Sequence, residues 1–364
     1  MTKNQKKDVI KELSPFLVEW YRENKRDLPW RQRVSAYHVW VSEIMLQLTR
    51  VEAVKAYYER FTRELPEISD LANVSEERLL KLWEGLGYYN RVRNMQIAAK
   101  QIMEEYGGSF PEEYDEIIQL KGIGSYTAGA ISSFAFGKAR PAVDGNVLRV
   151  LARILGDDGD IAKASVKKQM EELLFDVIPK DCPGDFNQGL IELGAIVCVP
   201  NGEPKCGCCP VSAWCQARIQ NRIDELPVKS KAKSRKVEKR TVFILKLRDE
   251  TGICKRADTG LLAGMYELPN VLGHLSQKQA LAYVAETGYK PLYIEKLPDA
   301  KHIFSHVEWQ MKGYAVLLDE IAEPEEKNPA ILFRNPVVIE KEYAIPSAFA
   351  AYMSYLDIKI GGHV

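Results

Sequence analysis

The stretch "LKGIGSYTAGAISSFAFG", Leu120–Gly137, decides how this chain is interpreted. Gly122 and Gly124 flank one apolar residue between two amphipathic stretches, and the second stretch begins near Ser125. Glycines let the backbone approach an anion closely, and the first amides of the following helix are free to bind it. Such a turn can hold one DNA phosphate without reading sequence. A GxG before a helix is also typical of a plain turn between helices, so the stretch predicts a helical hairpin and leaves its ligand open.

The composition predicts a soluble, two-domain protein. The 364 residues suffice for two cores, and 46% apolar with 27% charged residues is the profile of a globular chain. No apolar run approaches the roughly 20 residues that a membrane span needs, and the N-terminus lacks the apolar core of a signal peptide. We therefore expect a cytoplasmic location, beside the bacterial nucleoid if the partner is DNA. The formal net charge of zero neither supports nor excludes such a partner.

Hydrophobic periodicity divides the chain into a helical lobe and a second domain. Helices are expected within residues 1–225, at 7–24, 36–62, 75–86, 91–106, 111–119, 125–136, 145–155, 163–176 and 184–195. Residues 226–240 contain the basic run "KSKAKSRKVEKR" and are interpreted as a linker, either solvated or in contact with phosphate. From residue 241 to 364, β-branched runs such as "RTVFILKL" predict an α+β domain that ends in a helix.

Five of the seven cysteines lie in "CVPNGEPKCGCCPVSAWC", Cys198–Cys215. Thiols stay reduced in the cytoplasm, so the cluster favours a metal centre over disulfides. Only Cys206 and Cys209 have CxxC spacing, and the wide separation of Cys198 and Cys215 suits an iron–sulfur cubane better than one zinc ion. Zinc and a group of inert thiols remain the alternatives. Cys208 is interpreted as a spare thiol.

Two carboxylates stand out by their surroundings. Asp144, in "AVDGNVLRVLAR", precedes a helix near its N-cap, where free amides should keep its pKa low and Asn146 can bond its carboxylate. Glu43, in "VWVSEIMLQLTRVEAV", lies on a largely apolar helix and is either solvated or buried with a raised pKa. Taken singly, Asp144 is better explained as a helix cap and Glu43 as a solvated residue beside Ser42.

Taken together, these features resemble the helix-hairpin-helix DNA glycosylases. The shared pattern is a Gly-Ile-Gly hairpin, an aspartate 20 residues after Gly124, and a four-cysteine loop that begins 54 residues beyond that aspartate. Within that superfamily, the chain resembles the MutY adenine DNA glycosylases over nearly its whole length. The motifs that carry this resemblance are "LPWR" (28–31), "SEIMLQLTR" (42–50), "GLGYYNR" (85–91), "GIGSYTAGA" (122–130) and "VDGNVLRV" (143–150).

The resemblance implies a multidomain architecture and a DNA-repair activity. An all-α glycosylase lobe, with its hairpin at about 120–136 and an iron–sulfur loop at 198–215, would precede a C-terminal α+β Nudix-like domain. The activity would be that of a monofunctional glycosylase of base excision repair, acting as a monomer on double-stranded DNA. Its target would be adenine mispaired with 8-oxoguanine or guanine. A 4Fe-4S cluster would be held by Cys198, Cys206, Cys209 and Cys215.

The resemblance also assigns the catalytic residues. Glu43 would protonate a flipped adenine at N7 and later activate water, which requires a pKa raised towards neutrality. Asp144 would stabilise the oxocarbenium-like sugar, as paired carboxylates do in retaining glycosidases. Tyr126 and Asn146 would orient these groups. Strand-cleaving relatives such as endonuclease III carry a lysine where this hairpin has Tyr126, and a phenol cannot form an imine with the abasic sugar.

Further positions match the family's DNA contacts, although each is also compatible with ordinary packing or a surface position. Gln188 offers one donor and one acceptor to the edge of adenine. The expected base pocket consists of Arg26, Trp30, Arg31 and Gln188. The expected DNA contacts are Leu48, Tyr88, Gly122, Gly124 and Ser125, with Tyr88 as a wedge that intercalates beside the lesion.

In the second domain, "GLLAGMYELPN" (260–270) resembles the approach to a Nudix helix. The following "SQKQALAYVAETG" (276–288) offers only Glu286 where a Nudix hydrolase needs a cluster of magnesium-binding carboxylates. We therefore expect no nucleoside-diphosphate hydrolysis. The resemblance implies that Phe304, Ser305 and His306 instead read the 8-oxoguanine opposite the adenine.

Two departures from the family pattern bear on function. Seven residues separate Cys198 from Cys206 where the family usually has six, which makes the first cluster ligand less secure. Leu48 replaces the second glutamine of the usual "LQQTR", so this side chain can wedge between bases but cannot hydrogen-bond to them.

Three rival functions remain at this stage. An endonuclease III-like lyase is opposed by Tyr126, and a Nudix hydrolase by the missing acidic cluster. A non-catalytic iron–sulfur protein that binds DNA would need neither Glu43 nor Asp144.

Overall fold

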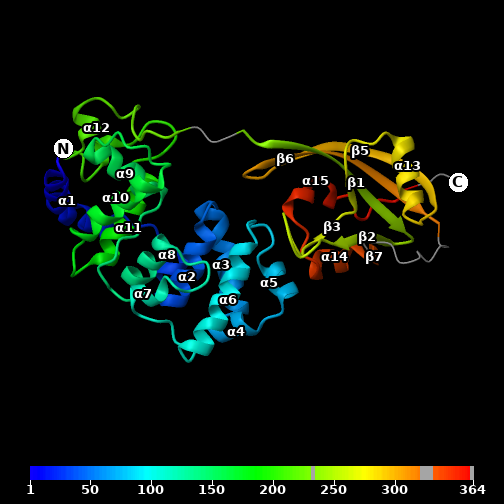
Figure 1. The fold of residues 1–364 in the computed structure, drawn as a ribbon, viewed down its shortest axis with the longest axis horizontal. Helices are drawn as coiled ribbons and strands as arrows, with labels where there is room; N and C mark the ends of the chain where they lie inside the picture. Colours follow the sequence, from blue (N-terminus) through cyan, green and yellow to red (C-terminus); the bar gives the residue numbers. More distant parts are fainter. Residues whose placement is uncertain (231–233, 320–330, 361–364) are drawn as a thin grey trace. The chain divides into compact units, whose positions relative to one another are not determined.

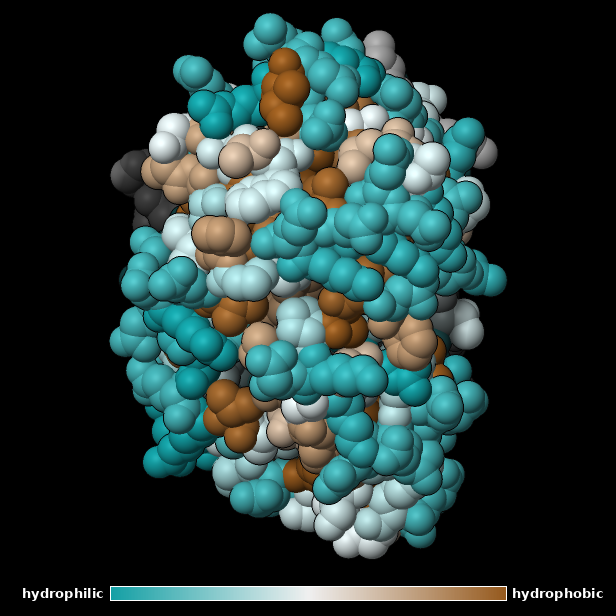
Figure 2. All heavy atoms as spheres, turned by 90° about the vertical axis from the view of Figure 1, so that its left-hand side faces the viewer, coloured by the Kyte–Doolittle hydropathy of each residue, from teal (hydrophilic) through white to brown (hydrophobic). Residues whose placement is uncertain are grey.

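The computed structural model describes residues 1–230, 234–319 and 331–360. The chain forms two compact units, one of residues 1–73 and 93–231 and the other of residues 74–92 and 232–364. Among the described helices, none combines the length and the apolar character needed to cross a bilayer. The face shown in Figure 2 is mostly hydrophilic, with scattered hydrophobic side chains.

The first unit is helical, as predicted (Figure 1). The agreement between periodicity and structure is closest at α9, which spans the predicted residues 145–155. Its elements are α1 (Lys3–Asn24), η1 (Pro29–Arg31), α2 (Ala36–Leu46), α3 (Val51–Glu64), α4 (Ile68–Asn73), most of α6 (Asn90–Glu105), α7 (Tyr114–Ile117), α8 (Ser125–Ala130), the π-turn η2 (Ile131–Ala135), α9 (Gly145–Leu155), α10 (Ala164–Phe175), α11 (Pro183–Ile196), η3 (Cys206–Cys208) and α12 (Gln216–Ile219).

Helix α9 is the central element of this unit's core. Asp144 caps its first turn, and Gly156, with φ 59°, ends it in the left-handed conformation that glycine favours. Buried apolar side chains of α1, α9, α10 and α11 form one continuous cluster around it. Because the helix is held on several sides, the position of Asp144 at its N-terminus is fixed by the core.

The single helix expected over 36–62 is wrong, because it is interrupted after Leu46. Helix α2 ends there, and α3 begins only at Val51. Leu48, in the break, has φ 65° and is 81% exposed. A large apolar side chain so exposed on a strained backbone is typical of a binding surface rather than of a core.

The hairpin predicted from Gly122 and Gly124 joins α7 to α8. Gly122 has φ +79°, and a Cβ at this position would lie 2.6 Å from the Cβ of Asn94. One turn into α8, a Cβ on Gly129 would lie 1.9 Å from the carbonyl oxygen of Pro141. Glycine at position 122 therefore lets the turn lie against α6, and glycine at position 129 lets α8 lie directly against the segment that leads to Asp144.

The second unit is built on a mixed sheet, so the α+β prediction is confirmed (Figure 1). The strand order is β3-β2-β1-β6-β5, with β4 paired to β1 and β7 to β2; β1 and β6 are parallel, and the other pairs are antiparallel. Its elements are α5 (Glu76–Leu82), β1 (Lys236–Leu247), β2 (Glu250–Lys255), β3 (Tyr266–Glu267), β4 (Asn270–Leu272), α13 (Gln277–Glu286), β5 (Pro291–Ile303), β6 (Val307–Leu318), β7 (Ile331–Arg334), α14 (Pro336–Glu342), η4 (Ser347–Phe349) and α15 (Ala350–Met353).

Each face of this sheet has its own core. Helix α13 packs through Ala280 and Val284 on the face that carries Phe243 and Tyr314. The segment from α14 to α15 covers the other face, around Trp309.

Two features differ from the predicted division of the chain. Strand β1 begins at Lys236, inside the stretch interpreted as a linker over 226–240, because residues 236–246 pair with β6. Residues 231–233 of that stretch lie outside the described residues. In addition, residues 74–92 group with the C-terminal part of the chain although the sequence surrounds them with helical-lobe residues.

Candidate active site

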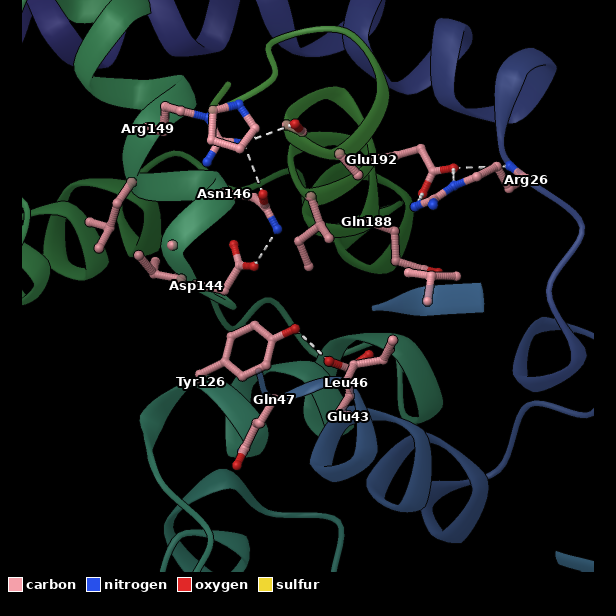
Figure 3. Close-up of a pocket in the computed structure, with 18 of the residues that line it drawn as sticks. Arg26, Glu43, Leu46, Gln47, Tyr126, Asp144, Asn146, Arg149, Gln188 and Glu192 are labelled. Atoms are coloured by element: carbon pink, nitrogen blue, oxygen red, sulfur yellow. Dashed lines mark hydrogen bonds and ion pairs between the residues drawn. The ribbon is translucent and has the colours of Figure 1, made fainter. Parts of the chain in front are cut away.

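One large cavity in the first unit gathers the predicted catalytic and base-pocket residues (Figure 3). Its volume is about 1770 Å³, and its lining comes from α2, the break before α3, α8, the start of α9, and α11. The predicted residues that line it are Arg26, Trp30, Arg31, Glu43, Leu48, Tyr126, Asp144, Asn146 and Gln188. Residues about 100 positions apart in the chain, Glu43 and Asp144, therefore face one space.

Glu43 is buried, with 6% of its surface exposed, so the solvated alternative is wrong. Burial raises the pKa of Glu43 to about 7, partly offset by a short hydrogen bond that the Tyr126 hydroxyl donates and reinforced by the charge of Asp144. Burial likewise raises the pKa of Tyr126 well above its ordinary value, so the phenol remains a donor. A carboxyl with this pKa can hold a proton at neutral pH and deliver it to a base.

Asp144 is held by two donors at the N-terminus of α9. The Val147 amide donates to Oδ1 at 2.8 Å, and the Asn146 side-chain amide donates to Oδ2 at 2.8 Å. The expectation of a low pKa is wrong: burial raises the pKa of Asp144 above its ordinary value, although both donors lower it. Loss of water around the half-buried carboxyl outweighs two hydrogen bonds.

Asn146 is itself fixed by Arg149, a residue that the sequence analysis missed. The Arg149 Nη2 donates to the Asn146 side-chain oxygen at 2.9 Å and to the Gly194 carbonyl at 2.8 Å, and its Nε donates to the Cys198 carbonyl at 2.9 Å. The available signal was a pair of arginines, Arg149 and Arg153, within the mostly apolar "NVLRVLARIL". Figure 3 shows the contacts from Asp144 through Asn146 to Arg149. The bond from Arg149 to the Cys198 carbonyl extends them to the first residue of the cysteine loop.

The opposite side of the cavity is organised by Glu192, which the sequence analysis also missed. Its side chain has no exposed surface and bonds Arg26 Nε at 2.7 Å and Arg31 Nη2 at 2.9 Å. Burial alone would raise the pKa of Glu192, but the hydrogen bonds from Arg26 and Arg31 lower it to about 2. Arg31 also donates to the Gln188 side-chain oxygen at 3.3 Å, which orients the carboxamide. Its amide nitrogen has no hydrogen-bond partner among the described residues, so it can donate to a ligand.

Trp30 lines the cavity wall beside this network. It is 7% exposed and packs edge-on against Tyr58, with ring centroids 5.5 Å apart. The residue therefore combines packing with a position on the pocket wall.

The four predicted cysteine ligands line a second, small cavity together with Arg153 and Arg218. Arg153 Nη1 lies 3.2 Å from Cys198 Sγ, whereas Cys208 is exposed. Burial raises the pKa of Cys209 to about 12; a hydrogen bond from the Val211 amide lowers this pKa, and the charges of the neighbouring thiols raise it. Among the described residues, no group of three or more His, Cys, Asp or Glu side chains is arranged around a single metal ion. Four thiols around one cavity, with cations beside them, fit the donor set that an anionic iron–sulfur cluster needs.

Three hairpin residues with predicted DNA contacts, Gly122, Gly124 and Ser125, lie outside the lining of the main cavity. The Ser125 hydroxyl donates to Glu171 at 2.7 Å and accepts from Lys167 at 3.3 Å. Lys167 lines the cavity, so the start of α8 and the catalytic cavity share one basic side chain.

Tyr88 and the predicted lesion-reading residues belong to the second unit. Tyr88 has φ 49° and is 49% exposed. Phe304 begins a tight turn, in which its amide donates to the Val307 carbonyl at 2.8 Å, and its ring packs on Trp309 at 4.9 Å. Ser305 and His306 are exposed at the tip of that turn.

Comparison with known proteins defines the class. A model described as "HhH-GPD superfamily base excision DNA repair protein" matches residues 41–175, and a NUDIX domain model matches residues 241–355. A thermostable thymine-DNA glycosylase superposes with a TM-score of 0.52 and 29% identity, over 60% of this chain and 98% of that one. Endonuclease III in complex with DNA superposes with a TM-score of 0.50 and 24% identity, over 61% and 99% of the two chains. The fold is that of the helix-hairpin-helix base-excision repair proteins.

Similarity to characterised relatives narrows the class further. The adenine DNA glycosylase of Homo sapiens is 35% identical over 83% of this chain, which spans 66% of the human protein's length. The adenine DNA glycosylase of Buchnera aphidicola (subsp. Acyrthosiphon pisum) is 32% identical over 88% of this chain and 91% of its own length. The chain therefore belongs to the adenine DNA glycosylase family.

Proposed function

We propose that this protein is a monofunctional DNA glycosylase of base excision repair. It removes adenine mispaired with 8-oxoguanine or guanine by flipping the adenine from the duplex and hydrolysing its N-glycosidic bond. The observation that carries the proposal is a buried carboxyl with a pKa of about 7, Glu43, facing the same cavity as Asp144. Paired carboxyls whose surroundings differ are the usual acid–base machinery for cleaving glycosidic bonds.

The flipped adenine would be oriented before any bond breaks. Gln188 presents an amide to the base edge, and Arg31 is held in place by Glu192. A carboxamide can pair with an adenine edge, and a fixed guanidinium reduces the entropy lost on binding. Leu48, exposed in the break between α2 and α3, would enter the space that the adenine leaves.

Proton transfer from Glu43 to adenine N7 then makes the base a leaving group. The N9–C1′ bond breaks, its electron pair stays on adenine, and positive charge develops at the sugar C1′ and O4′. Asp144, fixed by Val147 and Asn146, stabilises this charge. Glu43, now ionised, accepts a proton from the water whose oxygen bonds to C1′, so the carboxyl ends the cycle protonated.

Tyr126 supports the monofunctional assignment. Its hydroxyl is engaged with Glu43 and cannot form an imine with the abasic sugar. We therefore expect base removal without strand cleavage.

The cysteine loop would bind a 4Fe-4S cluster through Cys198, Cys206, Cys209 and Cys215, which line one cavity. The bound cluster would brace the loop, whose basic residues such as Lys205 and Arg218 can then contact DNA phosphates. Visible absorbance together with iron analysis of the purified protein tests this part. A colourless protein containing zinc would contradict it.

In the Nudix-like domain, we propose that Ser305 and His306 read the N7–H and O8 edge of 8-oxoguanine. The support is their exposure at the tip of a turn that Phe304 anchors on Trp309. Exchange of both residues for alanine should reduce the preference for 8-oxoguanine:adenine over guanine:adenine. An unchanged preference would remove this role.

Single-turnover assays on duplexes that differ only at the mispair test the function as a whole. We expect adenine release from 8-oxoguanine:adenine, slower release from guanine:adenine, and nicked strands only after alkali. Nicking without alkali would favour the lyase alternative, and binding of the duplex without release would favour a non-catalytic protein.

A further inference from the structure

We propose that Glu84 and Lys81 are positioning residues that dock the wedge loop, residues 85–89, onto the Nudix-like domain. The wedge Tyr88 and the lesion-reading turn at Phe304–His306 would then engage DNA as parts of one body. The inference rests on the proposed function, because it concerns how lesion reading and intercalation are coordinated.

The docking contact consists of two charged side chains that each bond the backbone between α14 and η4. The Glu84 carboxylate accepts from the Ile345 amide at 2.8 Å, and the Lys81 ammonium donates to the Tyr343 carbonyl at 3.0 Å. The two side chains also bond each other at 2.6 Å, with 14% of Lys81 and 28% of Glu84 exposed. Partly buried, charge-assisted bonds of this kind are stronger than surface ion pairs. Residues 74–92 accordingly group with residues 232–364.

The wedge loop is rigidly attached to this contact. Trp83, fully buried next to Glu84, donates its indole N–H to the Gly87 carbonyl at 3.1 Å. Arg91 donates to the carbonyls of Leu86 and Gly87, each at 3.2 Å. The Arg91 guanidinium also lies over the Tyr88 ring, 5.4 Å from its centroid. These contacts hold Tyr88 in its positive-φ conformation, half exposed.

On the other side of the contact, the lesion-reading turn rests on the same core. Ile345 is 4% exposed and belongs to a hydrophobic cluster with Trp309 and Phe349. Phe304 packs against that cluster through Trp309, with ring centroids 4.9 Å apart. A continuous series of contacts therefore runs from the wedge loop through Glu84 and Ile345 to the turn that carries Ser305 and His306.

This arrangement has a functional consequence. Recognition of the 8-oxoguanine edge by the turn would fix where the wedge enters the stack, so the two contacts would be energetically coupled rather than independent. Removal of the Glu84 carboxylate should break that coupling without touching any residue of the catalytic cavity.

The test uses the full chain with three substitutions. Glu84→Ala removes the acceptor, Glu84→Gln keeps an acceptor oxygen for the Ile345 amide, and Glu77→Ala is the matched control. Glu77, in the same unit, makes an exposed ion pair with Lys255 at 3.6 Å. Amide hydrogen exchange of residues 85–89 in each variant reports docking independently of activity.

Activity then measures the coupling. Single-turnover assays measure adenine release by three variants: Tyr88→Ala, the pair Ser305→Ala and His306→Ala, and all three substitutions together. Each is made in the wild-type, Glu77→Ala, Glu84→Gln and Glu84→Ala backgrounds. We expect non-additivity of about tenfold in the wild-type, Glu77→Ala and Glu84→Gln backgrounds, falling to near additivity in Glu84→Ala. Exchange at residues 85–89 should rise in Glu84→Ala alone.

Unchanged exchange, or equal non-additivity with and without the Glu84 carboxylate, would overturn the docking proposal. A wild-type protein with no preference for 8-oxoguanine:adenine would instead contradict the proposed function, while the exchange experiment would still decide whether Glu84 docks the loop.

Discussion

The hydrogen bond from Tyr126 to Glu43 makes a quantitative prediction about pH dependence. The phenol stabilises the ionised carboxylate, so Tyr126→Phe should raise the pKa of Glu43 above its present value of about 7. A hydrogen bond to a charged group is worth about 1.5–3 kcal/mol, and each pKa unit corresponds to about 1.4 kcal/mol. The expected displacement is therefore about one to two pH units upward.

The direction of the pH dependence follows from the role of Glu43 as the acid. If Glu43 must be protonated to donate to N7, the single-turnover rate falls as the pH rises through its pKa. In Tyr126→Phe, the alkaline limb should move from about pH 7 to about pH 8–9, while the maximal rate declines because the carboxyl is less well oriented. Tyr37→Phe is a matched control, since its buried hydroxyl donates to the Leu65 carbonyl and lies outside the cavity lining.

The assay is single-turnover adenine release from an 8-oxoguanine:adenine duplex between pH 5 and pH 10, with saturating enzyme. The same limb should appear in the wild type and in Tyr37→Phe. An alkaline limb that stays in place, or moves downward, in Tyr126→Phe would refute the assignment of Glu43 as the acid.

Three further predictions concern stability. Glu43→Gln should slow excision severely yet stabilise the fold by about 3 kcal/mol near pH 8, which urea titration at several pH values measures. The gain in stability should vanish towards pH 4.5, because a raised folded-state pKa destabilises the fold only where the carboxyl of the unfolded chain is ionised. Glu192→Gln should lower the free energy of unfolding by on the order of 3 kcal/mol at pH 7, because two partly buried arginines lose their charged partner. This difference from the wild type should disappear only as the pH falls through about 2, the pKa of Glu192 in the folded protein. An unchanged melting temperature at pH 7 would contradict the prediction. Gly129→Ala should destabilise the folded protein by about 3 kcal/mol or more, since the new Cβ would meet the Pro141 carbonyl oxygen at 1.9 Å. Gly124→Ala is the control: a Cβ at this position would meet no atom within 4 Å, so this variant should unfold like the wild type.

The parts of the fold that the sequence predicted are those with local signals. Helix α9 was bounded correctly because Asp144 caps it and Gly156 ends it. The interruption after Leu46 was not predicted, because "LQLTRVEAV" continues the apolar periodicity, and no Gly or Pro marks the strained backbone at Leu48. Propensity cannot reveal a break that tertiary contacts impose.

In the candidate site, too, the sequence predicts the residues that lie in local motifs and misses those that depend on tertiary contacts. Motif resemblance predicts Glu43, Tyr126 and Asp144 as site residues, and the three side chains line one cavity. The predicted low pKa of Asp144 is wrong, since burial depends on elements remote in the sequence. Arg149 and Glu192 were missed because single charges on apolar helices have no partner in sequence, and only the packed helices bring them to Asn146 and to Arg31.

The central claim is that Glu43 and Asp144 act as a unit on one glycosidic bond. Its most direct test is the single-turnover rate of adenine release by Glu43→Gln, Asp144→Asn and the double variant on an 8-oxoguanine:adenine duplex. Residues that act as a unit are strongly non-additive, so the double variant should be no slower than the slower single variant. Near-wild-type release by either single variant, or a double-variant rate equal to the product of two independent losses, would contradict the account.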